Sequence, residues 1–535
     1  MKMPWIGATL AVAALLCARP AAAQIGIVTL TGGRVEGVMA DGVVSFKGIP
    51  FAAPPVGNLR WRSPQPVRPW GGIRKADRFA AGCMQTPIVV PIFGEPPAMS
   101  EDCLYLNVWT PAKSAGARLP VMVWIYGGSF LEGMTSQPVY DGTHLAQKGV
   151  IVVSLAYRLG VFGFLADPEL SAESPLHVSG NQGLLDMIAG LKWVRRNITK
   201  FGGDPSRVTI FGESAGAISV GAIAQSPLAK GLFQRAIGES GDALDDLFHE
   251  FVLLPQAQRY GQRFLAKLGA TSNAAARALG AQTLLKAQGP ALVPGNGAFS
   301  PWMVVGGNEL PEEGYRLYEV RRFDDTPVLI GTNSDEGTIF VPPHTTPSQF
   351  EAQVRAQFGS FAAEVLAAYP HATEAESSQA AADLVRDSTF AWGARTWARL
   401  QSAYGKNKAY LYYFDEHAPQ YPPQGAPHGA EIGYVFDNLG TLIHTASKVT
   451  FPAAATDPAL AAMIGSYWVN FARTGNPNGP GLPHWPAFND KSQRVMVFDA
   501  HPSARPLPNR RQLEALDLYF TWARQQERSP AQTQH

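Results

Sequence analysis

Short apolar runs alternate with segments of helical periodicity along most of the chain. Five runs rich in β-branched and aromatic residues have the character of strands buried on both faces, and they cover residues 121–125, 150–153, 208–211, 328–330 and 410–414. Between the second and third runs, apolar residues recur every three or four positions over 184–198, which predicts an amphipathic helix. This alternation predicts an α/β fold with a central, mainly parallel, twisted sheet flanked by helices.

Three further regions add to this architecture. Residues 34–48 carry two β-like runs around Asp41-Gly42, a hairpin turn signal, and predict a small antiparallel sheet near the N-terminus. Segments near 250–300 and 345–405 are rich in Ala, Gln and Leu, which favour helices. We expect them to be helical insertions that cover a site.

The first residues have the features of a secretory signal peptide. A positive charge at Lys2 precedes an apolar run over 5–18, and small residues at 21–23 predict cleavage before Gln24. We therefore expect residues 1–23 to be a signal peptide and the mature protein to be secreted or periplasmic.

Neither a membrane span nor a lipid anchor is expected. The apolar run has roughly 14 residues, fewer than the ~20 that cross a bilayer as a helix. A lipid anchor at Cys17 is disfavoured because Leu16 is bulkier than the small residue that precedes such a cysteine. No repeat or flexible linker divides the remaining chain, which predicts one domain over 24–524 and a polar tail over 525–535.

Composition and charge narrow the class of function. Hydrophobic residues make up 46% of the chain and charged residues only 16%, which excludes a disordered protein. The 44 basic and 43 acidic side chains give a net charge of +1, so no basic excess is present to bind nucleic acid. The 53 glycines and 43 prolines are dispersed without a period and indicate many shaped turns.

Two cysteines remain after signal-peptide removal, Cys83 and Cys103. In an exported protein disulfides persist, so we predict one bridge that closes the Pro-rich loop between them. The alternative is a pair of buried free thiols. A catalytic or metal-binding thiol is less favoured because no histidine is near either cysteine in sequence and no Cys-x-x-Cys pair exists.

The strongest chemical signal is a Gly-x-Ser-x-Gly motif at residues 212–216, between the predicted strand 208–211 and a small, apolar helix over 217–224. On such a sharp strand-to-helix turn the side chain of Ser214 is exposed above the sheet, and glycines avoid collisions with the neighbouring backbone. The amide of Ala215 then points toward whatever Ser214 attacks. Ser240 fails the same pattern because Asp242 occupies its last place.

A serine nucleophile needs a base, and the base needs an acid that fixes its tautomer. In this type of fold the chain order is serine, acid, histidine. His428 lies in a loop beyond the strand 410–414, and Asp335 and Glu336 directly follow the strand 328–330, where polar side chains gather at the carboxyl end of a sheet. His428 is therefore the predicted base, and on chemistry alone either Glu336 or Asp335 can be the acid.

With these residues in place, the chain resembles the type-B carboxylesterase and cholinesterase-like family of α/β hydrolases over nearly all of its mature length. The supporting segments are residues 46–52 (FKGIPFA), 100–107 (SEDCLYLN), 180–186 (GNQGLLD) and 201–205 (FGGDP). The resemblance implies Glu336 as the acid, His428 as the base and a Cys83–Cys103 bridge.

The same resemblance implies an oxyanion hole within residues 126–130, after a strand, formed by the amides of Gly128 and Ser129 together with Ala215. Most relatives have a glycine where Ser129 stands. Its hydroxyl either points away and leaves the amide unaffected, which we favour, or narrows and polarises the pocket.

The resemblance also bears on the substrate. Cholinesterases bind a quaternary ammonium on an aromatic wall, but the only aromatic residue between the two cysteines is Phe93, and Ile339 stands where choline binders present an aromatic residue. Acetylcholine is therefore not the expected substrate. Glu239 stands where relatives carry an uncharged residue, and it either contacts a polar substrate or pairs with an arginine. Candidate pocket residues, each with a core role as the alternative, are Phe130, Trp302, Ile339, Phe340 and Tyr434.

These features predict a secreted serine carboxylesterase that forms an acyl-enzyme on Ser214 from a small, neutral, partly apolar ester. The alternatives are a non-catalytic binding module of the same fold and an acyltransferase or amidase that uses the same residues. No metal or organic cofactor is expected, because the sequence has no His-Glu-x-x-His, no dinucleotide-binding glycine fingerprint and no phosphate-binding loop.

Overall fold

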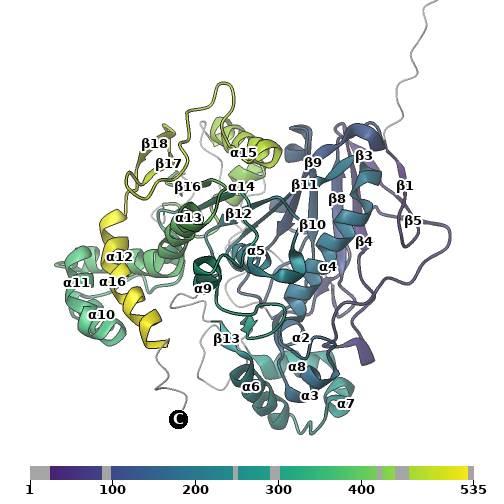
Figure 1. The fold of residues 1–535 in the computed structure, drawn as a ribbon, viewed down its shortest axis with the longest axis horizontal. Helices are drawn as coiled ribbons and strands as arrows, with labels where there is room; N and C mark the ends of the chain where they lie inside the picture. The colour runs from purple at the N-terminus through teal and green to yellow at the C-terminus, as the bar shows by residue number, and fades with distance from the viewer. Residues whose placement is uncertain are drawn as a thin grey trace, which may run out of the picture.

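The protein is built around one large twisted sheet (Figure 1). A computed structural model describes residues 25–86, 98–244, 251–289, 302–417, 425–439 and 457–527, so the predicted signal peptide lies outside the described residues. The sheet has eleven strands in the order β18-β17-β16-β15-β12-β11-β9-β10-β8-β4-β3. Their bounds, in chain order, are β3 Val38–Ala40, β4 Val43–Pro50, β8 Tyr105–Thr110, β9 Leu119–Ile125, β10 Ile151–Leu155, β11 Gly203–Glu213, β12 Arg235–Glu239, β15 Val328–Asn333, β16 Ala409–Phe414, β17 Arg494–Phe498 and β18 Ser503–Pro506.

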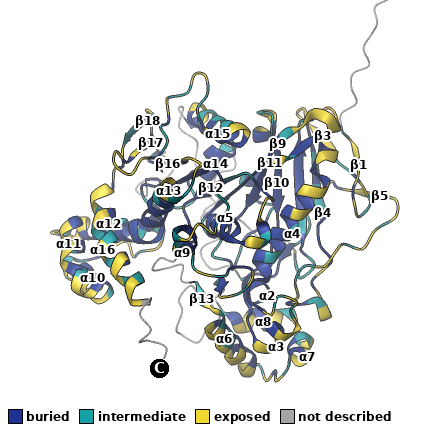
Figure 2. Cartoon of the chain, viewed as in Figure 1, coloured by how far each residue is buried: buried dark blue, intermediate teal, exposed yellow. Residues whose placement is uncertain are grey.

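The strands from β10 to β17 pair in parallel, and the pairs toward both edges are antiparallel. Every residue of β10, β15 and β16 is buried, as expected for strands covered on both faces (Figure 2). All five predicted strands and the predicted helix, α4 (Gln182–Asn197), are present. The predicted fold class is therefore confirmed.

Helices pack on the sheet and bury its central strands. α5 (Ala215–Gln225) lies on β11 and β12, α13 (Trp392–Tyr404) on β15 and β16, and α15 (Asp457–Thr474) on β9 and β11. Every residue of α5 is buried, which explains why this helix consists mainly of small and apolar residues.

A small N-terminal sheet is also present, but its strands differ from the prediction. The hairpin at Asp41-Gly42 forms, yet its strands β3 and β4 extend the edge of the large sheet, because β4 pairs with β8 and buries Val44 and Phe46 there. The separate small sheet is made of β1 (Ile27–Thr29), β2 (Arg34–Glu36) and β5 (Ile73–Lys75). It is mixed, not antiparallel, because β2 pairs antiparallel with β1 and parallel with β5.

Both regions expected to form helical insertions contain helices (Figure 1). The first contains α6 (Leu254–Lys267), α7 (Asn273–Ala278) and α8 (Ala281–Gln288). The second contains α10 (Pro347–Phe358), α11 (Ala362–Ala368), α12 (Glu374–Arg386) and α13, with a π-helical turn over Asp387–Ala391. At the C-terminus, α16 (Arg510–Glu527) continues past Gln525, where the polar tail was expected to begin. Within the described ranges, no helix is both long and apolar enough to span a bilayer.

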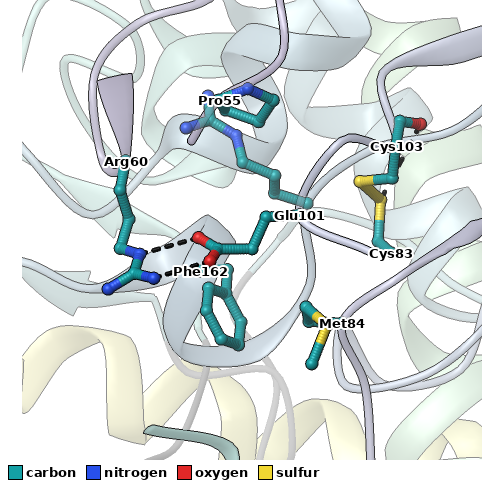
Figure 3. A pocket seen from close by; sticks show the side chains of 8 residues that line it. Pro55, Arg60, Cys83, Met84, Glu101, Cys103 and Phe162 are labelled. Atoms are coloured by element: carbon teal, nitrogen blue, oxygen red, sulfur yellow. Dashed lines mark hydrogen bonds and ion pairs between the residues drawn. A yellow bond between two sulfur atoms is a disulfide. The ribbon is translucent and has the colours of Figure 1, made fainter. Parts of the chain in front are cut away.

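The predicted disulfide joins Cys83 and Cys103, with an S–S distance of 2.02 Å and a Cα–Cα distance of 5.0 Å. Both cysteines are buried. Figure 3 shows the bridge close to Arg60 and Glu101, which form an ion pair with an Nη2–Oε1 distance of 2.6 Å. The disulfide therefore closes the loop between the two cysteines, and the Arg60–Glu101 ion pair connects that loop to a neighbouring segment.

We expect the Cys83→Ser/Cys103→Ser variant to lose about 3 kcal/mol of unfolding free energy. The bridge closes a loop with a sequence separation of 20, and its removal returns that loop's conformational freedom to the unfolded chain. Urea unfolding followed by circular dichroism measures the difference, with the reduced wild-type enzyme as a control. An unchanged midpoint in both samples would contradict the expectation.

Candidate active site

Ser214 lies at the sharp turn between β11 and α5, with φ 55° and ψ −126°. This is a strained conformation for a residue with a side chain. Added Cβ atoms would lie 2.6 Å from the Ile125 carbonyl oxygen at Gly212 and 2.1 Å from it at Gly216, so the turn requires both glycines. The Ser214 amide donates a 2.8 Å hydrogen bond to the Glu239 carbonyl of the next strand, which holds the turn in place.

The imidazole of His428 is held by a buried carboxylate. Its Nδ1 lies 2.5 Å from Oε2 of Glu336, which follows β15 and has no exposed surface. The other oxygen, Oε1, accepts hydrogen bonds from the Ser240 hydroxyl at 2.5 Å and from the backbone N–H of Asn333 at 2.7 Å. Three donors therefore fix this carboxylate, and it in turn fixes the orientation of the ring.

Asp335, the other carboxyl group that the sequence left open as the acid, makes different contacts. Its Oδ2 accepts hydrogen bonds from the Ser334 hydroxyl at 2.5 Å and from the Ala426 amide at 3.0 Å. Of the two neighbouring carboxyl groups, only Glu336 hydrogen-bonds to His428.

The second ring nitrogen of His428 faces Glu213, with 3.2 Å between Nε2 and Oε1. Among the described residues, the two ring nitrogens contact Glu336 and Glu213, and neither is hydrogen-bonded to the Ser214 hydroxyl. Burial lowers the pKa of His428, but the negative charges of Glu213 and then Glu336 outweigh burial and raise this pKa to about 9. Burial also raises the pKa of Glu213 to about 7, against the opposing effect of His428.

Two aromatic rings lie against the imidazole. Phe390 stacks on it with 4.5 Å between ring centroids and 27° between the planes. Phe340 lies 5.4 Å from it and is 43% exposed. Because Phe390 belongs to the π-helical turn, the insertion near 345–405 does contribute to the surroundings of His428.

The loop after β9 lies directly against Ser214, since a Cβ on Gly127 would be 2.9 Å from the Cβ of Ser214. Gly128 and Ser129 have φ of 102° and 53°. Among the described residues, their amides donate no hydrogen bond, and the Ala215 amide is the first of α5, outside the helix's own hydrogen bonds. These three amides are therefore available to bind an oxyanion.

Glu239 is fully buried and is not part of an open pocket surface. Its Oε1 accepts a 2.7 Å hydrogen bond from Trp468 Nε1, so its partner is an indole and not the arginine considered above. Burial, followed by the charge of Glu431, raises the pKa of Glu239 well above its ordinary value. Glu431 accepts a 2.5 Å hydrogen bond from Asn333 Nδ2, and burial raises its pKa to about 8. The surroundings of His428 therefore hold a group of buried glutamates, which consists of Glu213, Glu239, Glu336 and Glu431.

The other pocket candidates divide by exposure. Phe130 and Tyr434 are each 1% exposed and pack on Phe164 and Phe414, with ring centroids 5.0 and 5.1 Å apart. These two side chains belong to the core. The candidates that are partly or largely exposed are Trp302, Ile339 and Phe340.

Sequence reasoning missed four residues that contact the site. Glu213 lies inside the Gly-x-Ser-x-Gly motif, and Glu431 lies three residues after His428, so a search for carboxyl groups beside the motifs would have found both. Ser240 was set aside as a nucleophile, but it donates to Glu336. Phe390 has no signal in the sequence, because only the packing of the insertion brings it to the ring.

One group of side chains has the composition of a metal site. Ligand atoms of Asp335, Asp415 and His417 lie within 4.8 Å of one another. His417 Nε2 is 3.0 Å from Asp415 and 3.3 Å from Asp335, and Asp335 also accepts the two hydrogen bonds described above. These contacts account for the cluster as an exposed ion-pair group.

We expect the Glu213→Gln variant to move the acid limb of the kcat/KM profile to lower pH by about one unit or more. His428, as the predicted base, must be neutral to accept a proton, and removal of a negative charge 3.2 Å from Nε2 lowers the pKa of His428. Hydrolysis of a neutral ester across the pH range measures the limb.

Glu239→Gln is the matched control, because Glu239 pairs in register with Glu213 on the next strand. Burial raises the pKa of Glu239 well above its ordinary value, so its replacement by an amide should change the charge near His428 less than Glu213→Gln does. If the acid limb of Glu213→Gln stayed in place or moved to higher pH, a negative charge on Glu213 would not be what raises the pKa of His428.

Comparison with known proteins identifies the family. The model of the carboxylesterase family matches residues 24–516. The chain is 40% identical to fumonisin B1 esterase of Sphingopyxis macrogoltabida over 87% of its length and 85% of that protein, and 37% identical to para-nitrobenzyl esterase of Bacillus subtilis over 89% and 95%. A solved structure of PNB esterase superposes with a TM-score of 0.80 at 36% identity, covering 92% of this chain and 99% of that one. The chain therefore belongs to the carboxylesterase family of α/β hydrolases, as its motifs predicted, and it is a carboxylic ester hydrolase.

Proposed function

We propose that this protein is a secreted serine carboxylesterase that works through an acyl-enzyme. Ser214 Oγ attacks the ester carbonyl carbon while His428 Nε2 takes its proton. The amides of Gly128, Ser129 and Ala215 stabilise the oxyanion. The alcohol then leaves with the proton, and water, activated by the same imidazole, releases the acid and restores Ser214.

The 2.5 Å contact between His428 Nδ1 and Glu336 Oε2 is the observation that carries this proposal. A proton on Nδ1, donated to the carboxylate, leaves the lone pair on Nε2 for the serine proton. In the reacting complex the Ser214 hydroxyl has to reach Nε2, the atom that Glu213 faces in this structure. Catalytic hydrogen bonds often tighten only when substrate binds.

The surroundings of the imidazole favour a neutral, partly apolar ester. Phe340 and Phe390 lie beside His428, and Phe340 is 43% exposed and so offers part of its ring to a substrate. The charges of Glu213 and Glu336, which raise the pKa of His428, oppose a further negative charge near the ring. The names of two relatives, a fumonisin B1 esterase and a para-nitrobenzyl esterase, suggest a para-nitrobenzyl ester as the first probe.

Export is part of the proposal. The charged start, apolar run and small residues within 1–23 support it. The Cys83–Cys103 bridge agrees with an oxidising compartment, where such bonds persist.

Partitioning of the acyl group tests the acyl-enzyme. Several esters that share one acyl group but differ in their alcohol are hydrolysed with methanol present, and the ratio of methyl ester to free acid is measured. A common acyl-enzyme gives one ratio for all the alcohols, because each passes through the same intermediate. A ratio that changes with the leaving alcohol would contradict the proposal, and a ratio dominated by methyl ester would favour an acyltransferase.

A further inference from the structure

A cavity of about 270 Å³ lies near the start of α4 and beside α3 (Pro168–Glu173). No residue that lines it belongs to the candidate active site described above. Its volume is slightly below the ~300 Å³ of the smaller ligand pockets, and Leu170, Val178 and Leu185 give it apolar walls. The cavity therefore suits a small, partly apolar molecule.

Glu309 lines this cavity and is only 1% exposed. Its Oε2 is buried and has no hydrogen-bond partner in the described chain. Burial raises the pKa of Glu309 to about 7. A buried carboxylate oxygen without a cation or donor is costly, so a ligand that supplies either to Oε2 would bind with a gain in free energy.

A second unsatisfied acceptor lines the same cavity. Gln182 is 4% exposed, and its Nε2 donates a 3.1 Å hydrogen bond to the Trp61 carbonyl. This bond fixes the orientation of the side-chain amide and leaves Oε1 as its unused acceptor. Oε1 is buried and has no partner among the described residues. Arg62, a cation that also lines the cavity, is paired with Glu173 at 3.2 Å and does not neutralise Glu309.

We propose that this cavity binds a small organic ammonium ion whose N–H groups donate to Glu309 Oε2 and Gln182 Oε1 and whose alkyl part packs on the apolar walls. A protonated primary amine has both the charge and the donors that these two acceptors need. Calcium takes about six to eight oxygen ligands, three to four times the two unmet acceptors. The site is separate from ester hydrolysis and does not depend on the proposed function.

Isothermal titration calorimetry of the full-length enzyme with n-butylammonium tests the proposal. Tetramethylammonium carries the same charge without N–H donors, and ionic strength is matched. We expect saturable binding of n-butylammonium only, weakened at least about tenfold by Glu309→Gln. Glu312→Gln, the same change at an exposed residue nearby, is the control and should keep wild-type affinity.

The wild-type enzyme supplies a second readout that needs no variant. Because an ionised Glu309 binds the cation, affinity should be higher at about pH 8 than at about pH 6. Equal binding of both cations, equal affinity of Glu309→Gln and wild type, or no saturable heat at either pH would overturn the proposal and leave a cavity filled by water.

Discussion

We expect Ser214→Ala to lower kcat for ester hydrolysis by roughly four to six orders of magnitude, the largest effect of any substitution considered. The hydroxyl is the atom that forms the acyl bond in our proposal, and members of such a unit act together. Folding should be little affected, because the strained turn is held by backbone contacts and by Gly212 and Gly216. Steady-state kinetics with a para-nitrobenzyl ester gives the loss.

Ser219→Ala is the matched control. Ser219 lies on the same helix, α5, and its hydroxyl donates to the Ala215 carbonyl within that helix at 2.8 Å. Its removal deletes a fully buried hydroxyl of the same helix without touching the reacting atoms, so kcat should stay close to the wild-type value. Turnover by Ser214→Ala that approaches that of Ser219→Ala would remove Ser214 from the reaction.

The second largest effect is expected for Glu336→Gln, with kcat lowered by roughly 10³- to 10⁴-fold. An amide at this position no longer stabilises the imidazolium, and its NH₂ group can turn the ring to the unproductive tautomer. The carboxylate also accepts from Ser240 and Asn333, so it cannot turn away without breaking both hydrogen bonds. Circular dichroism and the unfolding midpoint show that the variant remains folded.

Asp335→Asn is the natural comparison because it makes the same change one residue earlier. Asp335 accepts hydrogen bonds from Ser334 and Ala426 and makes none to His428. The substitution should therefore lower kcat only by the effect of one ordinary hydrogen bond, roughly tenfold or less. If Asp335→Asn lowered kcat more than Glu336→Gln does, the assignment of Glu336 as the acid would be wrong.

The parts of the structure that local sequence determines were predictable. The apolar runs fix strands, and the glycines around Ser214 fix the strand-to-helix turn, because a Cβ at either place would collide with the carbonyl of Ile125. The disulfide was predictable from the expectation of export and from the number of cysteines. Such features depend on neighbours in sequence or on residue type.

Features that depend on side-chain direction or long-range packing were not predictable from the residues alone, and only the resemblance to the family favoured Glu336 as the acid. Asp335 and Glu336 are adjacent and chemically alike, and only the turn after β15 decides which one hydrogen-bonds to His428. Phe390 reaches the ring because an insertion folds back over the site. The hairpin at residues 38–50 was recognised, but its sheet was not, because β8 pairs with it from another part of the chain.

The direct test of the central claim is covalent labelling with a fluorophosphonate, followed by peptide mass spectrometry. An activated serine attacks phosphorus and stops at a stable ester, so we expect one adduct per chain, on the peptide that contains Ser214. Labelling should be strongly slowed in His428→Ala, which lacks the base. An adduct on a different serine, or full ester hydrolysis by a protein that takes up no label, would contradict the mechanism.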